Sequence, residues 1–185
     1  DTFEDDDASA PISYIKPVKA GSLRAACCMA DNTVFPHTIT LAMTGASGAA
    51  YGLRLLECLI QAQRRVYFLI SDAARTVVKM EMGIELPQGT EALESFLVQR
   101  CKAQPGQLRV FGNLDWLAPP ASGTGGKIPM IICPASGGVI SAIATGASTN
   151  LVQRAADVAI KEKRPLILVP REMPASAIHL ENQLK

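Results

Sequence analysis

The sequence is poor in histidine, a common side chain in metal sites and in acid–base catalysis. It has only two histidines, His37 and His179, which argues against a histidine-based zinc site, and we expect no bound metal. Its five cysteines are scattered and form no C-x-x-C pair, a pattern that favours reduced thiols in the cytoplasm. A Ser-His-Asp triad is not excluded, but the G-x-S-x-G motif of one large hydrolase class is absent. The chemistry must therefore depend on other groups.

Long hydrophobic runs and an excess of one charge are also missing. The 185 residues carry 18 lysines and arginines against 17 aspartates and glutamates, and the net charge of +1 gives no basic footprint for nucleic acid. No apolar run approaches the roughly 20 residues of a membrane-spanning helix. With 48% hydrophobic and 19% charged residues, the chain has the composition of one globular domain. We therefore expect a cytoplasmic protein without a nucleic-acid partner or a membrane span.

Regular patterning begins only after the first 37 residues. Residues 1–37 open with clustered acidic side chains and contain three prolines without a sustained period, which is typical of a disordered or non-native extension. The first residue is not methionine, so the chain is also compatible with a fragment or a processed product. Residues 38–185 are predicted to form the folded domain.

From residue 38 onward, short apolar strands alternate with amphipathic helices. We predict strands at 39–43, 66–70, 108–111, 130–133 and in PLILVP from Pro165, and helices at 49–63, 71–82, 91–102, from 139, from 149 or 150 to 163, and 175–185. The strands are continuous apolar runs, as in parallel sheets buried on both faces. The predicted fold class is therefore α/β, with a parallel sheet and helices on both faces. The loop 118–127 is expected to be mobile, in the manner of a lid.

Small or hydroxyl-bearing residues follow three of the predicted strands. They are residues 45–48 after the first strand, Ser71 after the second and residues 135–138 after the fourth, and Arg171 follows the fifth. Ligands of parallel sheets bind beyond the carboxyl ends of the strands, where helix N-termini and arginine side chains donate to anions. Close packing of a helix on the sheet is the alternative explanation for one such turn. Two turns together with Ser71 and Arg171 favour an anion site.

Two common phosphate-binding motifs are broken. Ala50 interrupts the glycine fingerprint of short-chain dehydrogenases, and no Tyr-x-x-x-Lys pair follows, which argues against a dinucleotide-dependent hydride transfer. The Gly-Lys pair ending at Lys127 resembles the end of a Walker motif. However, Ala121 replaces the first glycine of that motif and Ile128 replaces its hydroxyl residue. Neither motif identifies the ligand.

Four charged residues remain as candidates for chemistry. Arg154 and Lys161 are seven residues apart, on one face of a predicted helix and roughly 10 Å apart along its axis. Asp157 lies between them, and a solvated face in which it pairs with both is the alternative explanation. Glu81 and Glu172 are the carboxylates nearest to the strand ends, and each alone is more often a surface residue than a catalyst.

Five separated segments resemble the UbiX-type flavin prenyltransferases, formerly described as 3-polyprenyl-4-hydroxybenzoate decarboxylases. They are, in order, TGASGAAYGLRLL, FLISDAA, ICPASGG, NLVQRAADVAIKEKRPLILVPRE and PASAIHLENQLK. The resemblance implies a Rossmann-like flavoprotein fold and a homo-oligomer with FMN bound between subunits. It also implies a reaction in which a dimethylallyl group from dimethylallyl monophosphate is joined to N5 and C6 of reduced FMN. The prenylated flavin then serves a UbiD-type decarboxylase, in ubiquinone biosynthesis among other pathways.

The resemblance also implies roles for particular residues. The active-site charged residues are Glu81, Arg154, Lys161 and Glu172. The flavin-binding residues are Gly45, Ala46, Ser47, Ser71, Ser136, Gly137, Gly138, Val139 and Arg171. A buried arginine–lysine pair needs an anion, which an allylic phosphate supplies. We expect Glu172 to donate a proton to the leaving phosphate or to shuttle protons, and Glu81 to accept the proton lost on ring closure.

The sequence departs from the family pattern at two positions and at its end. Ala135 and Val139 replace the usual cysteine and threonine, and the missing hydroxyl at Val139 removes one hydrogen bond worth roughly 0.5–1.5 kcal/mol. The family continues beyond the segment ending at Lys185 with a strand, a substrate-phosphate tyrosine and a helix. If Lys185 is the true terminus, we expect FMN binding rather than turnover.

Two alternative functions remain open. A flavoprotein that binds FMN without catalysis has no reason to keep the four charged residues. A flavoprotein that decarboxylates a peptidyl or pantothenoyl cysteine needs a histidine after the first helix, and the sequence has none between His37 and His179.

Overall fold

The computed structural model describes residues 37–123 and 127–185. The prediction of a disordered extension at residues 1–37 therefore falls, except for His37, outside the described residues, and so do residues 124–126 of the predicted lid. Within the described residues, no helix is long and apolar enough to cross a bilayer.

Strands and helices alternate along the described chain, as the sequence predicts. The strands are β1 (Thr38–Met43), β2 (Arg65–Ile70), β3 (Leu108–Phe111), β4 (Met130–Ala135) and β5 (Leu166–Pro170). The helices are α1 (Ala49–Gln61), α2 (Asp72–Met82), α3 (Thr90–Cys101), α4 (Gly137–Ala144), α5 (Leu151–Lys161) and α6 (Ala177–Leu184), with a short 3-10 helix η1 at Pro119–Ala121. Each predicted element is therefore present, with ends displaced by a few residues.

Both element ends at the β4–α4 junction are displaced, each by two residues. Sequence patterning ends the strand at Cys133 and starts the helix at Val139, because Pro134 and the two following glycines are poor strand and helix formers. The strand instead continues past an irregularity in its register to Ala135, which is fully buried and pairs with Pro170 of β5. Pairing with β5 thus overrides the low strand propensity of this segment, at the edge of the sheet where ligands bind.

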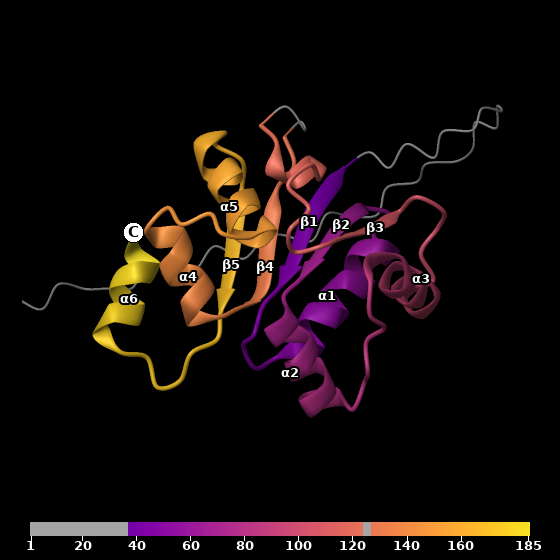
Figure 1. Cartoon of the computed structure of the whole chain (residues 1–185), viewed down its shortest axis with the longest axis horizontal. Coiled ribbons are helices and arrows are strands. Elements are labelled where there is room, and N and C mark those ends of the chain that lie inside the picture. Colours follow the sequence, from indigo (N-terminus) through magenta and orange to yellow (C-terminus); the bar gives the residue numbers. More distant parts are fainter. Residues whose placement is uncertain (1–36, 124–126) are drawn as a thin grey trace, which may run out of the picture. The chain divides into compact units, whose positions relative to one another are not determined.

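The five strands form one parallel sheet in the order β3-β2-β1-β4-β5 (Figure 1). The chain runs from β1 outward to β3, then crosses to the other side of β1 to form β4 and β5. The order therefore reverses between β1 and β4, and open α/β sheets bind ligands beyond the carboxyl ends of strands at such a point.

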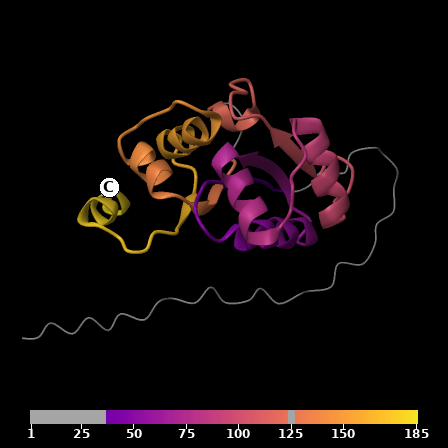
Figure 2. The ribbon, with the colours of Figure 1, turned by 60° about the horizontal axis from the view of Figure 1, so that its bottom comes forward.

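A separate hydrophobic core fills each face of the sheet, and Figure 2 shows the two helical layers on either side of it. One core packs α1, α2 and α3 on the sheet through residues such as Leu53, Val78 and Leu97. The other packs α4, α5 and η1 through residues such as Ile140 and Ala156. Helices on both faces confirm the predicted fold class.

The described part of the predicted lid is packed rather than free. Ala118 and Ala121 are buried in the second core, with only 2% and 6% of their surface exposed. The buried guanidinium of Arg164 donates hydrogen bonds to the carbonyls of Ser122 and Gly123. The expected mobility is therefore wrong for residues 118–123.

Gly52 sets how closely α1 lies on β4, and this gives a stability prediction. A Cβ atom at Gly52 would lie 2.5 Å from the carbonyl oxygen of Cys133 and 2.8 Å from the terminal methyl of Met43. We expect Gly52→Ala to lower the free energy of unfolding by about 1–3 kcal/mol through overpacking, measured by chemical denaturation. The control is Gly138→Ala in α4, where no heavy atom lies within 4 Å of the added Cβ. It should be neutral or stabilising, and equal losses for both variants would contradict the packing argument.

Candidate functional site

The turns that follow β1 and β5 meet the last residues of β4 around one cavity of about 270 Å³. Its walls are Ser47, Gly48, Tyr51, Cys133, Pro134, Val169, Pro170 and Arg171. Two of the residues predicted to bind the ligand, Ser47 and Arg171, therefore share a cavity at the reversal of strand order. Larger depressions exist at the amino edge of the sheet and along β3, but none of these turns lines them.

Thr44 connects the turn after β1 to the turn after β4. Its buried hydroxyl donates to the carbonyl oxygen of Pro134 at 2.8 Å and accepts from the backbone N–H of Ser136, also at 2.8 Å. The backbone N–H of Thr44 donates to the same Pro134 carbonyl at 3.2 Å. A side chain that both donates and accepts is needed here. Sequence reasoning gave Thr44 no role, because its partners lie about 90 residues away.

Glu81 binds the N-terminus of α1. Its carboxylate accepts from the backbone N–H of Gly48 at 3.0 and 3.1 Å and from that of Ala49 at 2.9 Å. The Ala49 hydrogen bond is the largest cause that lowers the pKa of Glu81, followed by the Gly48 bond, with smaller effects of the Ser47 hydroxyl and the Arg171 charge. The anion at this helix terminus is therefore a carboxylate of the protein itself.

The turn after β1 also has a packing reason for its small residues. A Cβ atom at Gly45 would lie 2.5 Å from the Cβ of Ala73 in the first turn of α2. Gly45 is thus required by the close approach of two segments, while Ser47 and Gly48 line the cavity. The packing explanation that the sequence left open therefore applies to Gly45, while anion binding by the turn stays a prediction. Ala46 is buried, so its side chain belongs to the packed part.

Ser71 is the N-cap of α2. Its hydroxyl accepts from the N–H of Ala74 at 3.1 Å, and its own N–H donates to the carbonyl of Met43 at the end of β1. Ser136 is the N-cap of α4, but its side chain makes no capping hydrogen bond. The start of α4, which includes Gly137, Gly138 and Val139, thus lacks the cap that its N-cap residue commonly supplies.

Arg171 and Glu172 follow β5 and lie next to the β4–α4 turn. The backbone N–H of Arg171 donates to the carbonyl of Ala135 at 3.2 Å, which fixes the turn after β5 to the end of β4. Glu172 Oε2 lies 2.8 Å from the position that a Cβ on Gly137 would occupy. Glu172 therefore lies against the first residue of α4.

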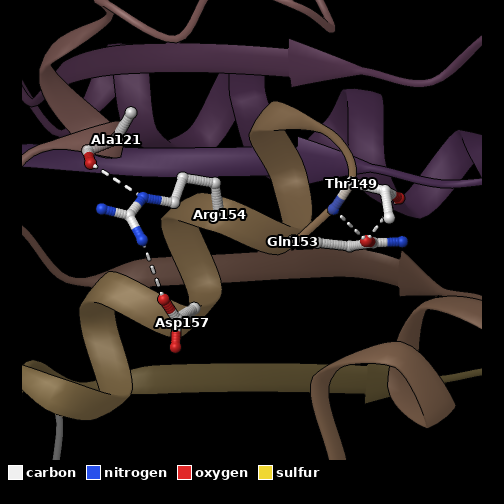
Figure 3. Close-up of polar contacts among 5 residues, drawn as sticks. All are labelled: Ala121, Thr149, Gln153, Arg154 and Asp157. Atoms are coloured by element: carbon white, nitrogen blue, oxygen red, sulfur yellow. Dashed lines mark hydrogen bonds and ion pairs between the residues drawn. The ribbon is translucent and has the colours of Figure 1, made fainter. Parts of the chain in front are cut away.

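Arg154 and Lys161 do not reach this cavity within one subunit. Figure 3 shows the guanidinium of Arg154 between Ala121 and Asp157; it donates to the Ala121 carbonyl at 3.3 Å and to the Asp157 carboxylate at 3.1 Å. Lys161 is exposed at the last residue of α5, just before β5 begins, and so lies toward the amino edge of the sheet. The pairing of Asp157 with Arg154, which the sequence offered as an alternative, is present.

Comparisons with known proteins identify the family. A family model described as "Flavoprotein" matches residues 31–185. "Flavin prenyltransferase UbiX" of Pseudomonas aeruginosa is 61% identical over 150 residues, covering 81% of this chain and 72% of that protein. Two solved structures are also similar. "AnUbiX (PadA1) in complex with FMN and dimethylallyl pyrophosphate" has a TM-score of 0.69 and 34% identity, over 80% of this chain and 71% of that one.

The second structure is a "dodecameric FMN-dependent Ubix-like Decarboxylase" from Escherichia coli O157:H7. It has a TM-score of 0.68 and 34% identity, and covers 80% of this chain and 73% of that one. The fold and the strand-end cavity thus define a flavoprotein of the Rossmann-like type. Within that class, the chain belongs to the UbiX family of flavin prenyltransferases.

Removing the Thr44 hydroxyl should weaken the link between the two turns. We expect Thr44→Val, which keeps the shape of the side chain, to cost about 1–3 kcal/mol of stability, because the N–H of Ser136 loses its partner. Thr44→Ser keeps the hydroxyl and should lose clearly less. Urea denaturation of both variants measures the difference, and equal stabilities would show that the hydroxyl bonds contribute nothing.

The contacts of Glu81 give a prediction for the pH dependence of stability. We expect Glu81→Gln to lower stability at pH 7 by about 1 kcal/mol, since an ionised carboxylate is favoured at a helix N-terminus. The pKa of Glu81 is lowered from 4.5 in the folded protein. Its contribution is therefore complete above that value and is lost as the pH falls through the lower folded value. Denaturation curves of wild type and Glu81→Gln should converge in acid, and a constant gap down to pH 2 would contradict this assignment.

Proposed function

We propose that this chain joins the dimethylallyl group of dimethylallyl monophosphate to N5 and C6 of reduced FMN, with release of phosphate. The observation that carries the proposal is the cavity in which Ser47 and Arg171 meet at the reversal of strand order, in a chain 61% identical to a flavin prenyltransferase. By the resemblance, the product serves a UbiD-type decarboxylase. The proposed location is the cytoplasm.

The residues at the strand ends suit a flavin phosphate and a second anion. Arg171 supplies fixed positive charge, and the start of α4 supplies backbone N–H donors that the Ser136 side chain does not cap. Ser47, which carries a hydroxyl, also lines the cavity. Bound FMN supplies the nucleophilic N5 and C6 positions. The protein then has to bind the flavin phosphate and the allylic phosphate. It also has to donate one proton to the leaving phosphate and to accept the proton lost on ring closure.

The two glutamates suit different proton-transfer roles. Glu81 is held in its ionised form by backbone N–H groups, so it can accept a proton but is not a proton donor near neutral pH. Glu172 is exposed beside the uncapped start of α4. We therefore assign the proton donated to the leaving phosphate to Glu172, and the proton lost on ring closure to Glu81.

The positions of Arg154 and Lys161 support an assembly of several copies. Both are expected to stabilise the departing phosphate, yet Lys161 lies toward the amino edge of its own sheet and Arg154 contacts η1. They can serve the cavity only if they belong to another copy of the chain. The proposal therefore includes a homo-oligomer with the flavin site between subunits.

Anaerobic incubation with reduced FMN and dimethylallyl monophosphate, followed by mass spectrometry of the flavin, tests the reaction directly. We expect the flavin to gain the mass of one prenyl unit. Bound but unmodified FMN would instead support the alternative of a non-catalytic flavin-binding protein.

Lys161→Ala separates binding from transfer in the same assay. Preset positive charge at the departing phosphate accelerates transfer, so its loss should reduce the rate by roughly 10²–10³-fold while bound FMN stays near the wild-type amount. Lys163→Gly is the matched control: it removes a nearby charge at a residue with a φ of 52°, which glycine adopts readily. Equal loss of flavin binding and transfer in Lys161→Ala would show that Lys161 is structural.

A further inference from the structure

Two side chains from the segment after β5 face the first residue of α4. A Cβ atom at Gly137 would lie 2.8 Å from Glu172 Oε2 and 3.4 Å from both Nε2 and Cδ2 of His179. The space left by the missing side chain of Gly137 is therefore bordered by a carboxylate and an imidazole. The spacing suits one shared hydrogen-bond partner between them, such as a water molecule or a phosphate oxygen.

The hydrogen bonds of His179 determine which of its nitrogens carries the proton. Ser176 is the N-cap of α6, and its backbone N–H donates to Nδ1 of His179 at 3.1 Å. The N–H of His179 donates in return to the Ser176 hydroxyl oxygen at 3.4 Å, which completes a capping box. Because Nδ1 accepts a hydrogen bond, the neutral ring carries its proton on Nε2. The nitrogen near Gly137 and Glu172 is thus a donor.

The ring is held in this place by a second contact between the helices. α6 packs beside α4 (Figure 1), and the side-chain amide of Asn182 donates to the hydroxyl of Ser141 at 2.9 Å. α4 itself contains no charged residue, and the nearest side chains to its first residue, Glu172 and His179, are both titratable. The fold therefore fixes the imidazole, while Glu172 lies on the connection between β5 and α6.

Capping alone does not require a histidine here. The residue three positions after the N-cap in a capping box is ordinarily glutamate or glutamine, which accept the same backbone N–H. What the imidazole adds is a rigid donor at Nε2, 3.4 Å from the Cβ position of Gly137 that Glu172 Oε2 also borders.

We propose that His179 is a positioning residue for Glu172. Its Nε2–H, fixed by the Ser176 capping box, holds the Glu172 carboxyl group at the start of α4, directly or through one shared hydrogen-bond partner. This inference rests on the proposed function, because it assumes that Glu172 exchanges a proton with the leaving phosphate. A side chain at residue 137 would displace the Glu172 carboxylate from this position.

Two substitutions that both preserve the capping box separate positioning from capping. Glutamine at residue 179 can accept from Ser176 and still donate, whereas glutamate can accept but has no donor and repels Glu172. We expect His179→Gln to keep kcat for prenyl transfer within a few-fold of wild type. His179→Glu should lose roughly 10²-fold in kcat, as misplaced catalytic groups do, with little change in KM for dimethylallyl monophosphate. Thermal unfolding should be alike for both.

The inference is wrong if His179→Glu retains the wild-type kcat. It is also wrong if both variants lose activity and stability together, because His179 would then act only as a cap. If the wild-type protein forms no prenylated flavin, that result contradicts the proposed function instead. A measurement on the free protein then tests whether His179 positions Glu172.

That measurement is the 15N NMR signal of the His179 ring, which is readily assigned because the chain has only two histidines. We expect the Nε2–H tautomer. Glu172→Gln should shift the Nε2 resonance, whereas Glu181→Gln, at an exposed residue of α6, should leave it in place. An Nδ1–H tautomer, or a resonance insensitive to Glu172, overturns the inference whatever the activity.

Discussion

The buried hydroxyl of Thr44 is the constraint on which the geometry of the site depends. Neighbouring parallel strands leave unpaired backbone groups where they end, and buried polar groups need partners. Thr44 supplies both a donor and an acceptor between β1 and the turn after β4. The Ser71 N–H bond to Met43 and the Arg171 N–H bond to Ala135 extend the same linkage to β2 and β5. Four strand ends are thereby linked, and residues at three of them, β1, β4 and β5, line the cavity.

Three of the helices that begin at this edge, α1, α2 and α4, differ in how their N-termini are satisfied. α1 receives the Glu81 carboxylate and α2 the Ser71 hydroxyl, whereas the Ser136 side chain leaves α4 uncapped. A ligand anion at the N-terminus of α1 must compete with Glu81 for the backbone N–H donors. At the N-terminus of α4 no side chain of the N-cap residue competes for them. The electrostatics of this edge thus favour phosphate binding at the start of α4 and Arg171. They favour it less at the turn after β1, although its small residues are the most prominent in the sequence.

Sequence patterning predicts the fold almost completely, because buried strands and amphipathic helices are local signals. It also predicts that Ser47 and Arg171 meet, since the carboxyl ends of parallel strands share an edge. It does not predict the partners of Thr44 and Glu81, which lie tens of residues away and depend on exact register. The contact of Arg154 with Ala121 was missed because two prolines conceal the short helix η1.

The seven-residue spacing of Arg154 and Lys161 shows why a shared helix face does not define a shared site. A helix between two parallel strands must return against the strand direction, so α5 begins near the carboxyl edge and ends near the amino edge. The topology of the sheet thereby places Lys161 far from the cavity of its own subunit, whatever rotamer its side chain adopts. A phosphate site that uses this lysine has to be completed by another copy of the chain. The positive charge at the site then depends on assembly of the oligomer. Dilution of the oligomer should then reduce prenyl transfer even where each subunit stays folded.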